Sequence, residues 1–339
     1  ALGWQDGRHR VERFFEWTSG VVGSSMPSDE AANECRRLMV DAVGAEVDQG
    51  SSTWADLSGG HDSSSVASIA GALSRQRSCR RLGGTITFVD SLGEGDETAF
   101  AKTVVDQYQL DWIRVQNPWP WQEDGLPPPE TDSPTRDYPY WARDRVVMRE
   151  LAARGGTNVM SGAGPDYYLP LTATHALDRV SKFRFAEAAA IIHDWTVQNR
   201  TTFSHVVPRE LLLPLLPTCV QSAVRRRRVK IPPWIRQDFS ARRTFIDAQV
   251  ARDVIHGWPG SLSVERAGQR LSELGSALEG WRKTAGLEVR HPLLSVPLVQ
   301  FCLALDHRLR TNYRRPKPVL RFAMRGIVPA TVLERVTKG

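Results

Sequence analysis

The stretch best suited to chemistry combines glycines, hydroxyls and one carboxylate, and reads Leu57-Ser58-Gly59-Gly60-His61-Asp62-Ser63-Ser64-Ser65. It lies between a strand-like run and a helix-like run. Its glycines would let the backbone approach an anion, its serines offer hydroxyl donors, and the free N–H groups of the helix start would point at a phosphate. Asp62 would repel phosphate unless a divalent cation lay between them, so the stretch predicts a nucleotide with Mg2+. An ordinary Gly/Ser turn with an Asp helix cap is the alternative interpretation.

A second loop has the same plan, and reads Val159-Met160-Ser161-Gly162-Ala163-Gly164-Pro165-Asp166. A strand-like run again leads into small residues and a single acid. In a parallel sheet the two loops would follow strands that end at the same edge, so Asp62 and Asp166 could share one Mg2+ ion. Asp166 taken alone could equally be an ordinary turn aspartate.

The elements that must position these loops alternate in type along the chain. A helix with apolar residues at helical spacing is expected from Ser28 onward. The later expected elements are strands at 52–57, 85–89, 112–115 and 158–160, separated by helices at 66–73, about 97–108 and about 140–154. This alternation predicts an α/β fold with a doubly wound parallel sheet that binds its ligand at the carboxyl ends of the strands. After about residue 170 the pattern becomes mainly helical, with proline-rich breaks.

Composition describes a globular chain without membrane segments. The 339 residues are 41% hydrophobic and 24% charged, and a chain of this length buries about three quarters of its unfolded surface. No run of about 18 apolar residues appears, and residues 1–10 lack the apolar core of a signal peptide, so we expect a cytoplasmic protein without membrane contact. Cys35, Cys79, Cys219 and Cys302 show no C-x-x-C spacing, so we expect buried thiols and no zinc site.

The charge balance is basic, with a formal net charge of +6. The densest run is Arg225-Arg226-Arg227-Arg228-Val229-Lys230. A solvated face is the default interpretation of such a run, and a site for a nucleic acid or an acidic peptide is the alternative.

The first loop resembles the pyrophosphate loop of the PP-loop ATP pyrophosphatases, which cleave ATP between its α and β phosphates. The second loop is similar to the S-G-x-G-x-D-E-[LI]-F element of the asparagine synthetase family. Two later segments match that family as well: Leu287–Leu294 resembles E-x-R-x-P-F-L-D, and Lys317-Pro318-Val319-Leu320-Arg321 resembles K-x-x-L-R. These four elements occur in the family's order. Residues 6–15 resemble the connector after a glutaminase domain, so we expect residues 1–27 to be a connector from such a domain and 28–339 to form the synthetase domain.

The resemblance implies roles for individual residues. It places Lys317 as the catalytic cation, beside Asp62 and Asp166 as metal-binding acids; a surface lysine is the alternative for Lys317. It implies that backbone groups of Thr87 and Phe88 contact adenine. The full set expected to bind ATP and Mg2+ is Leu57, Ser58, Gly59, Gly60, Asp62, Ser63, Ser64, Thr87, Phe88 and Gly162. Glu288 and Arg290 are expected to form a structural ion pair.

Departures from the family pattern favour a larger substrate than free aspartate. Ala163 stands where the family carries Glu or Tyr, and Leu294-Ser295 replaces L-D. Aromatic residues at 117–121, 138–141 and 167–168 are expected around the entrance and suit an apolar or peptide ligand, although several of these rings could simply be core. The segments at 63–67 and 232–235 resemble lasso-peptide cyclases. This resemblance implies that a precursor peptide's Asp or Glu side chain is adenylated and then closed into a macrolactam by the peptide's N-terminal amine.

Such an enzyme would have a precursor peptide as its substrate, and a leader peptidase and a leader-binding protein as its partners. Three alternatives remain open. One is an asparagine or β-lactam synthetase that acts on a small amino acid. Another is a tRNA-modifying PP-loop enzyme, which the arginine run would suit, although the terminus at 317–321 argues against nucleic acid. The third is a peptide-binding homologue without activity.

Overall fold

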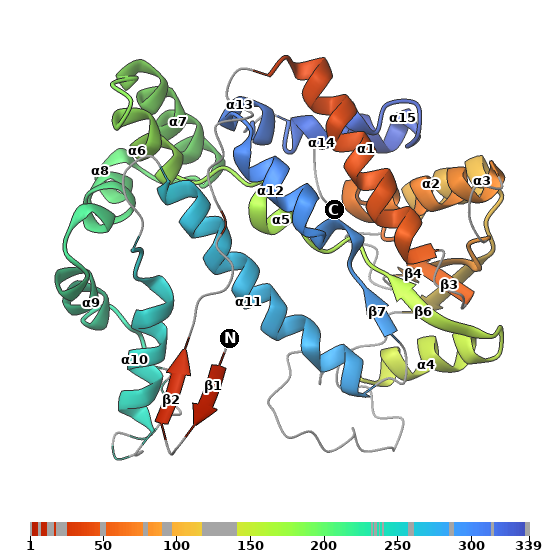
Figure 1. Cartoon of the computed structure of the whole chain (residues 1–339), viewed down its shortest axis with the longest axis horizontal. Coiled ribbons are helices and arrows are strands. Elements are labelled where there is room, and N and C mark those ends of the chain that lie inside the picture. The colour runs from red at the N-terminus through yellow and green to blue at the C-terminus, as the bar shows by residue number, and fades with distance from the viewer. Residues whose placement is uncertain are drawn as a thin grey trace. The chain divides into compact units, whose positions relative to one another are not determined.

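The computed structural model describes the chain in two compact units (Figure 1). The sheet unit comprises residues 22–171 and 270–339, and the helical unit comprises residues 1–21 and 172–269. The residues described are 2–5, 8–11, 17, 26–47, 52–76, 81–89, 97–116, 141–231, 233, 236, 238, 241–256, 261–284, 288–312 and 315–335.

The described strands of the sheet unit form one parallel sheet in the order β5-β4-β3-β6-β7. They are β3 (Ser52–Asp56), β4 (Gly84–Val89), β5 (Trp112–Gln116), β6 (Gly156–Met160) and β7 (Glu288–Arg290). The chain moves outward from β3 to β5 and then returns to the other side of β3 as β6. A doubly wound sheet of this kind binds ligands where the order reverses, here between β3 and β6. The predicted α/β fold is therefore confirmed.

Helices cover both faces of this sheet. The helices α2 (His61–Arg75) and α3 (Thr98–Tyr108) lie on one side of the strands, and α4 (Trp141–Ala152) lies on the other (Figure 1). The change of side follows from the reversed strand order, because each parallel crossover is right-handed. The apolar cluster under α4 contains Trp54, Ile86, Ile113, Val115, Val147, Leu151 and Val159.

The remaining helices of the sheet unit pack beside this core. The helix α1 (Ser28–Val47) buries Cys35, Met39 and Val43 at helical spacing, as predicted, and packs on α2, α12 and α14. The others are α5 (Pro165–Tyr168), η4 (Pro292–Leu294), α12 (Val296–Ala304), α13 (His307–Arg310), α14 (Pro318–Ala323) and α15 (Ala330–Glu334).

The strand β7 was absent from the sequence-based prediction. It pairs in parallel with β6, with Val289 opposite Val159. Three residues are too few to show the alternation by which a strand is recognised. Its position at the edge places the E-x-R-x-P segment next to the second loop.

The helical unit confirms the predicted helical character after residue 170. Its described elements are α6 (Thr174–Val180), α7 (Phe185–Gln198), α8 (Phe203–Val206), η2 (Val207–Leu212), η3 (Leu213–Leu215), α9 (Thr218–Arg226), α10 (Arg242–Asp253), the first part of α11 (Leu262–Thr284), and an antiparallel hairpin of β1 (Leu2–Gln5) and β2 (Arg8–Val11).

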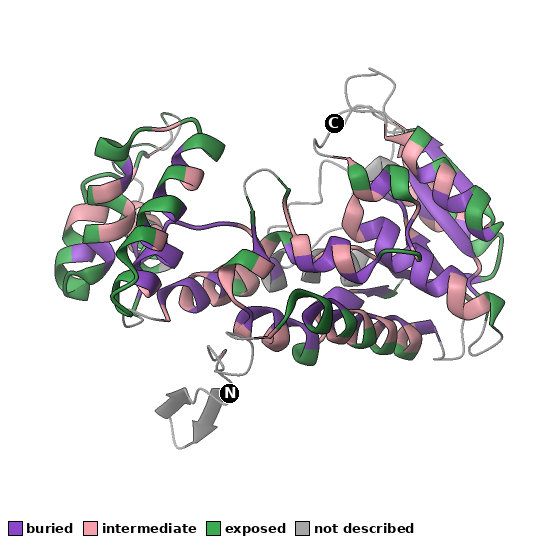
Figure 2. Cartoon of the chain, turned by 90° about the horizontal axis from the view of Figure 1, so that it is seen from above, coloured by how far each residue is buried: buried purple, intermediate pink, exposed green. Residues whose placement is uncertain are grey.

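Polar bonds support the small core of the helical unit. Leu177, Ile255 and Leu262 form an apolar cluster. The buried Gln221 side chain donates to the carbonyl oxygen of Leu216 at 2.9 Å and accepts from the backbone N–H of Ile255 at 3.2 Å. Figure 2 shows many exposed residues on these helices and buried residues along the strands of the sheet unit.

The expectation for the cysteines is partly wrong. Cys35 and Cys302 are buried, whereas Cys219 is exposed near the start of α9. In this short helix Gln221 is the buried residue, so Cys219 lies on the solvent side. Cys79 lies outside the described residues. Among the described helices, none has the length and apolar character needed to cross a membrane.

Candidate active site

Both predicted loops open onto one cavity of about 490 Å³ in the sheet unit. The cavity lies at the carboxyl ends of β3 and β6, where the strand order reverses. The described residues that line it are Asp56, Leu57, Ser58, Gly60, His61, Asp62, Ser63, Ile86, Phe88, Glu97, Ser161, Gly162, Ala163, Asp166 and Lys317.

A lysine between two carboxylates forms the centre of this cavity. The Nζ atom of Lys317 lies 2.6 Å from Oδ1 of Asp166 and forms an ion pair and hydrogen bond with Oδ2 of Asp62. The side chains of Lys317 and Asp62 are 11% and 14% exposed, whereas that of Asp166 is 49% exposed. Three charges from three segments far apart in the chain therefore meet at one point, two of them largely withdrawn from solvent.

The backbone of Lys317 is unusual. Its φ of 56° and ψ of 53° lie in the left-handed region, and the residue immediately precedes Pro318, the first residue of α14. Non-glycine residues rarely adopt this conformation, which costs about 1–3 kcal/mol and occurs preferentially at functional sites. The conformation directs the chain from the cavity into a helix within one residue.

Side chains from helices of the sheet unit hold the segment that follows Lys317. Arg36 of α1 donates from Nε to the carbonyl oxygen of Ala323 at 2.6 Å, and the hydroxyl of Tyr108 at the end of α3 donates to that of Ile327 at 2.5 Å. Arg321 donates to the carbonyl oxygen of Arg335 at 2.8 Å. The arginine of the K-x-x-L-R motif therefore has a structural role, and burial lowers its pKa from the ordinary arginine value.

Two of the serines of the first loop are hydrogen-bonded to each other. Oγ of Ser58 and Oγ of Ser63 are 3.0 Å apart, and the backbone N–H of Gly60 donates to Ser58 Oγ at 3.2 Å. Ser63 Oγ also accepts from the backbone N–H of Ser58 at 3.1 Å. These bonds close the turn between β3 and α2 and leave the start of α2 directed into the cavity.

Two glycines are required by close backbone contacts. A Cβ atom on Gly162 would lie 2.4 Å from the backbone nitrogen of Ser63, so the second loop packs directly on the start of α2. Gly59 has a φ of 87°, and a Cβ atom there would lie 2.5 Å from the carbonyl oxygen of Glu97. Substitution of either glycine would force the two loops or α3 apart.

The second loop is anchored to β7 and η4. Oγ of Ser161 lies 2.6 Å from Nδ1 of His291 and accepts from the backbone N–H of Ala163 at 3.2 Å. The buried hydroxyl of Tyr168 donates to the carbonyl oxygen of Leu293 at 2.9 Å. The E-x-R-x-P segment therefore positions the loop that carries Asp166.

His61 contributes a neutral ring to the cavity. Burial, followed by the positive charges of Arg321, Lys317 and Arg335, lowers the pKa of His61 to about 4. Its buried Nε2 atom has no hydrogen-bond partner among the described residues. At neutral pH the residue therefore offers an uncharged imidazole at the start of α2.

Most, but not all, of the predicted binding residues line the cavity. Gly59, Ser64 and Thr87 do not: Gly59 packs on the segment before α3, and Ser64 is completely buried within α2. The buried hydroxyl of Thr87 donates to the carbonyl oxygen of Leu57 at 2.7 Å and so ties β4 to the end of β3. Leu57, Ser58, Gly60, Asp62, Ser63, Phe88, Gly162, Asp166 and Lys317 line the cavity as expected.

Of the aromatic residues expected at the entrance, Tyr167 is half-buried and does not line the cavity. Residues 117–121 and 138–140 and the side chain of Trp141 lie outside the described part of the chain. Tyr168 is a core residue and not an entrance residue, because its ring is 2% exposed and its hydroxyl is bound to Leu293.

The sequence interpretation missed several residues that line the cavity, namely Asp56, His61, Ile86, Glu97, Ser161 and Ala163, the last of which was noted only as a departure from the family pattern. His61 and Ser161 lie inside the two quoted loops, so their position in the motifs was the available signal. Glu97 carried no such signal; it pairs with Arg335 at 2.6 Å from a distant part of the chain.

The predicted structural ion pair is present. Arg290 lies 3.1 Å from Glu288 and 3.5 Å from Glu46 at the end of α1, and it donates to the carbonyl oxygen of Glu46 at 2.8 Å. Arg290 is buried, so these contacts join the edge strand β7 to α1.

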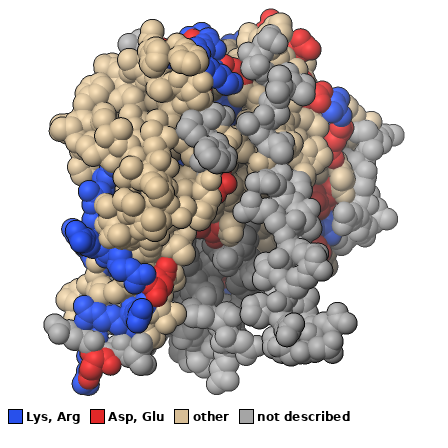
Figure 3. Space-filling model, turned by 60° about the vertical axis from the view of Figure 1, so that its left-hand side comes forward, with Lys and Arg blue, Asp and Glu red and all other residues tan. Residues whose placement is uncertain are grey.

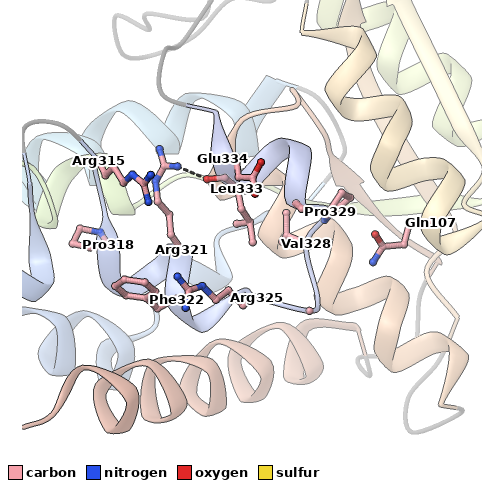
Figure 4. Close-up of a pocket in the computed structure, with 12 residues that line it drawn as sticks. Gln107, Arg315, Pro318, Arg321, Phe322, Arg325, Val328, Pro329, Leu333 and Glu334 are labelled. Atoms are coloured by element: carbon pink, nitrogen blue, oxygen red, sulfur yellow. Dashed lines mark hydrogen bonds between the residues drawn. The ribbon is translucent and has the colours of Figure 1, made fainter.

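A larger cavity of about 600 Å³ lies around α14 and α15 (Figure 4). Arg315, Arg321, Phe322, Arg325 and Leu333 contribute to its wall, and Arg321 is bonded to the carbonyl oxygen of Leu333. Its described lining residues include none from the two loops. The cluster of Asp62, Asp166 and Lys317 therefore lies in the smaller cavity.

The known structures that are similar to this chain share little sequence identity with it. Among solved structures, it is similar to the U34-tRNA thiolase NcsA from Methanococcus maripaludis, with 12% identity over 81% of this chain and 88% of that chain and a TM-score of 0.31. It is also similar to NAD+ synthetase from Burkholderia pseudomallei, with 17% identity over 43% of this chain and 66% of that chain and a TM-score of 0.25. No curated protein matches the sequence.

The family model for asparagine synthase matches residues 34–169 and 279–339. These two segments include both loops, the strand β7 and Lys317, and they make up more than half of the 339 residues. The chain belongs to the asparagine synthase family.

Proposed function

We propose that this protein forms an amide bond within a peptide at the expense of ATP. A side-chain carboxylate of the peptide attacks the α phosphorus of ATP and releases pyrophosphate, and the peptide's N-terminal amine then attacks the acyl carbon and releases AMP. The product is a macrolactam of the lasso-peptide type. Family membership supports ATP-dependent amide ligation. The observation that carries the proposal is the meeting of Asp62, Asp166 and Lys317 in one cavity.

The residues of the cavity fit a magnesium ion. Mg2+ prefers carboxylate oxygens and is commonly held by one or two carboxylates together with water and substrate phosphates. Asp62 and Asp166 supply two such carboxylates around a single cationic group. A bound Mg2+ ion would supply charge neutralisation for the pyrophosphate leaving group.

In the proposed reaction Lys317 stabilises negative charge. Amine attack on an activated acyl group builds negative charge on the carbonyl oxygen and on the departing phosphate, and a fixed ammonium stabilises both. The left-handed backbone and the helix that follows fix the position from which Lys317 reaches the cavity. The backbone N–H groups at the start of α2, from His61 onward, would orient phosphate.

The charges of the cavity support a peptide over free aspartate. Aspartate carries a second carboxylate that would need a cationic partner of its own. Among the described residues that line the cavity, Lys317 carries the only full positive charge, and it is already bound by Asp62 and Asp166. Ala163 presents only a methyl group on the same wall. A carboxylate inside a peptide has uncharged amide groups beside it and avoids this conflict.

The proposal is tested by incubating the protein with ATP, Mg2+ and a leader-free precursor peptide from a neighbouring gene. Mass spectrometry would follow the peptide, and AMP and pyrophosphate would be quantified in parallel. We expect the peptide to lose the mass of one water for each AMP formed. The matched control is the same peptide with an acetylated N-terminus, which can be adenylated but cannot close.

Two results would contradict the proposal. Pyrophosphate release with free aspartate and ammonia, but not with the peptide, would identify an asparagine-type synthetase. ATP cleavage that depends on tRNA and not on peptide would identify a tRNA-modifying enzyme.

A further inference from the structure

A second, strongly basic cavity lies within the helical unit. Its volume is about 390 Å³, and its wall is built from η2, α9, α10 and α11. Figure 3 views the molecule from the side of the helical unit. Lys and Arg side chains gather along one edge of this view. The described lining residues are Arg209, Glu210, Leu213, Arg225, Arg228, Val229, Lys230, Phe245, Gln249, Asp253 and Arg266. Cations therefore outnumber carboxylates in this wall.

The central arginine of this cavity lacks a close counter-ion. The Arg225 side chain is 15% exposed, and among the described residues it pairs with the carboxylate of Asp253 at 4.0 Å, which is too long for a hydrogen bond. The buried Nε atom of Arg225 has no hydrogen-bond partner among the described residues. Burial lowers the pKa of Arg225; the negative charges of Asp253 and Glu210 oppose this shift, and the positive charges of Arg266 and Arg209 add to it. A buried guanidinium in this situation is stabilised by an added anion.

The backbone of the wall is also irregular. Arg209 and Glu210 lie on η2, a π-helical segment that directly continues α8. Segments of this kind are rare and are frequent at functional sites. The irregular turn brings one cation and one carboxylate into the same cavity as Arg225.

The mixture of groups indicates the class of ligand. Glu210 and Asp253 would repel a nucleic-acid backbone but can accept hydrogen bonds from peptide N–H groups. Leu213, Val229 and Phe245 add apolar surface, and the cavity has room for a side chain rather than a duplex. We propose that this cavity binds an acidic peptide segment, with a carboxylate side chain seated on Arg225. The inference goes beyond the proposed amide synthesis and does not depend on it.

The test measures binding of two fluorescein-labelled peptides to the full chain by fluorescence anisotropy. Both peptides consist of glycine and serine with two central residues, which are glutamates in one and glutamines in the other. We expect the glutamate peptide to bind at least about tenfold more tightly, because a charge-assisted bond to a guanidinium is among the stronger polar contacts. The substitution Arg225→Gln should abolish this difference.

The matched control is Arg227→Gln. Arg227 follows α9 directly and carries the same charge, but it does not line the cavity. We expect this variant to keep the preference for glutamate within about twofold, as for an exposed charge. Arg228→Gln, which does change the wall, should reduce the preference at least about threefold and would replace Arg225→Gln if that variant failed to give a cooperative melting curve.

Three outcomes would overturn the inference. Equal losses in Arg225→Gln and Arg227→Gln would mean that only net charge attracts the peptide. Displacement of the peptide by tRNA at lower concentration would assign the cavity to nucleic acid. Displacement by inorganic pyrophosphate at lower concentration would assign it to a small free anion.

Discussion

The two charged cavities of this chain differ in how their buried cations are matched. In the sheet unit Lys317 is bound by two carboxylates at hydrogen-bond distance, whereas in the helical unit Arg225 has one carboxylate at 4.0 Å. A matched cluster is stable without a ligand, so a substrate must rearrange it. A cation without a close counter-ion still has an N–H group to donate, so an anionic ligand can bind it without breaking an existing ion pair. This difference fits the roles proposed for the two cavities, amide formation in the sheet unit and peptide binding in the helical unit.

The largest expected effect comes from breaking the matched cluster at Asp62. The substitution Asp62→Asn removes a carboxylate from Lys317 and from the proposed metal site, and should lower the rate of amide formation by at least about a thousandfold. AMP release measures this. Asp106→Asn on α3 is the control, because that exposed carboxylate pairs with Lys102 at the surface. Activity within tenfold of wild type would remove Asp62 from the chemistry.

Replacing the cation itself tests whether the cluster is also structural. Lys317→Met should lower the rate about a hundred- to a thousandfold. It should also lower the free energy of unfolding by about 1 kcal/mol, since two carboxylates remain without their counter-ion. Millimolar Mg2+ should then raise the melting temperature of this variant more than that of wild type. An identical response of both proteins to Mg2+ would contradict a metal site between Asp62 and Asp166.

The hydrogen bond between uncharged groups that anchors the second loop should have a smaller effect. Tyr168→Phe leaves the carbonyl oxygen of Leu293 without its 2.9 Å bond and should cost about 1–2 kcal/mol in the free energy of unfolding. Tyr167→Phe, at the half-buried neighbouring position, is the control and should change stability little. Denaturant unfolding compares the two. Equal effects would mean that the buried hydroxyl bond does not hold the loop.

The smallest effect is expected at the unmatched cation. In the absence of ligand, Arg225→Gln should leave the free energy of unfolding unchanged within about 1 kcal/mol, or raise it, because the desolvated charge is poorly compensated. A loss well above this value would show that Arg225 is matched in solution, and the contrast between the two cavities would disappear.

Local patterns explain what could be predicted from the sequence. Asp62 and Asp166 each follow a strand within a small-residue loop, and alternation of strands and helices placed both at one sheet edge. The pairing of Lys317 with both acids was not derivable from spacing, because it joins residues that are more than 150 positions apart in the chain. Only resemblance to a family suggested that Lys317 acts at this site.

What could not be predicted depended on tertiary contacts. Tyr168 reads as an entrance aromatic until its hydroxyl is seen bonded inside the core. The arginine run at 225–228 reads as a solvated face, yet Arg225 is largely buried while Arg227 is exposed. Burial of one residue within a run of identical charges is decided by helices distant in sequence, and so leaves no local pattern.

The left-handed backbone of Lys317 has a consequence for engineering this enzyme. The residue type that best suits such a backbone is glycine, and the residue type that supplies the ammonium shared by Asp62 and Asp166 is lysine, so the backbone and the side chain make opposite demands on one position. Replacing Lys317 by glycine would therefore not make the protein more heat-resistant, because the relief of backbone strain is offset by two carboxylates left without their counter-ion.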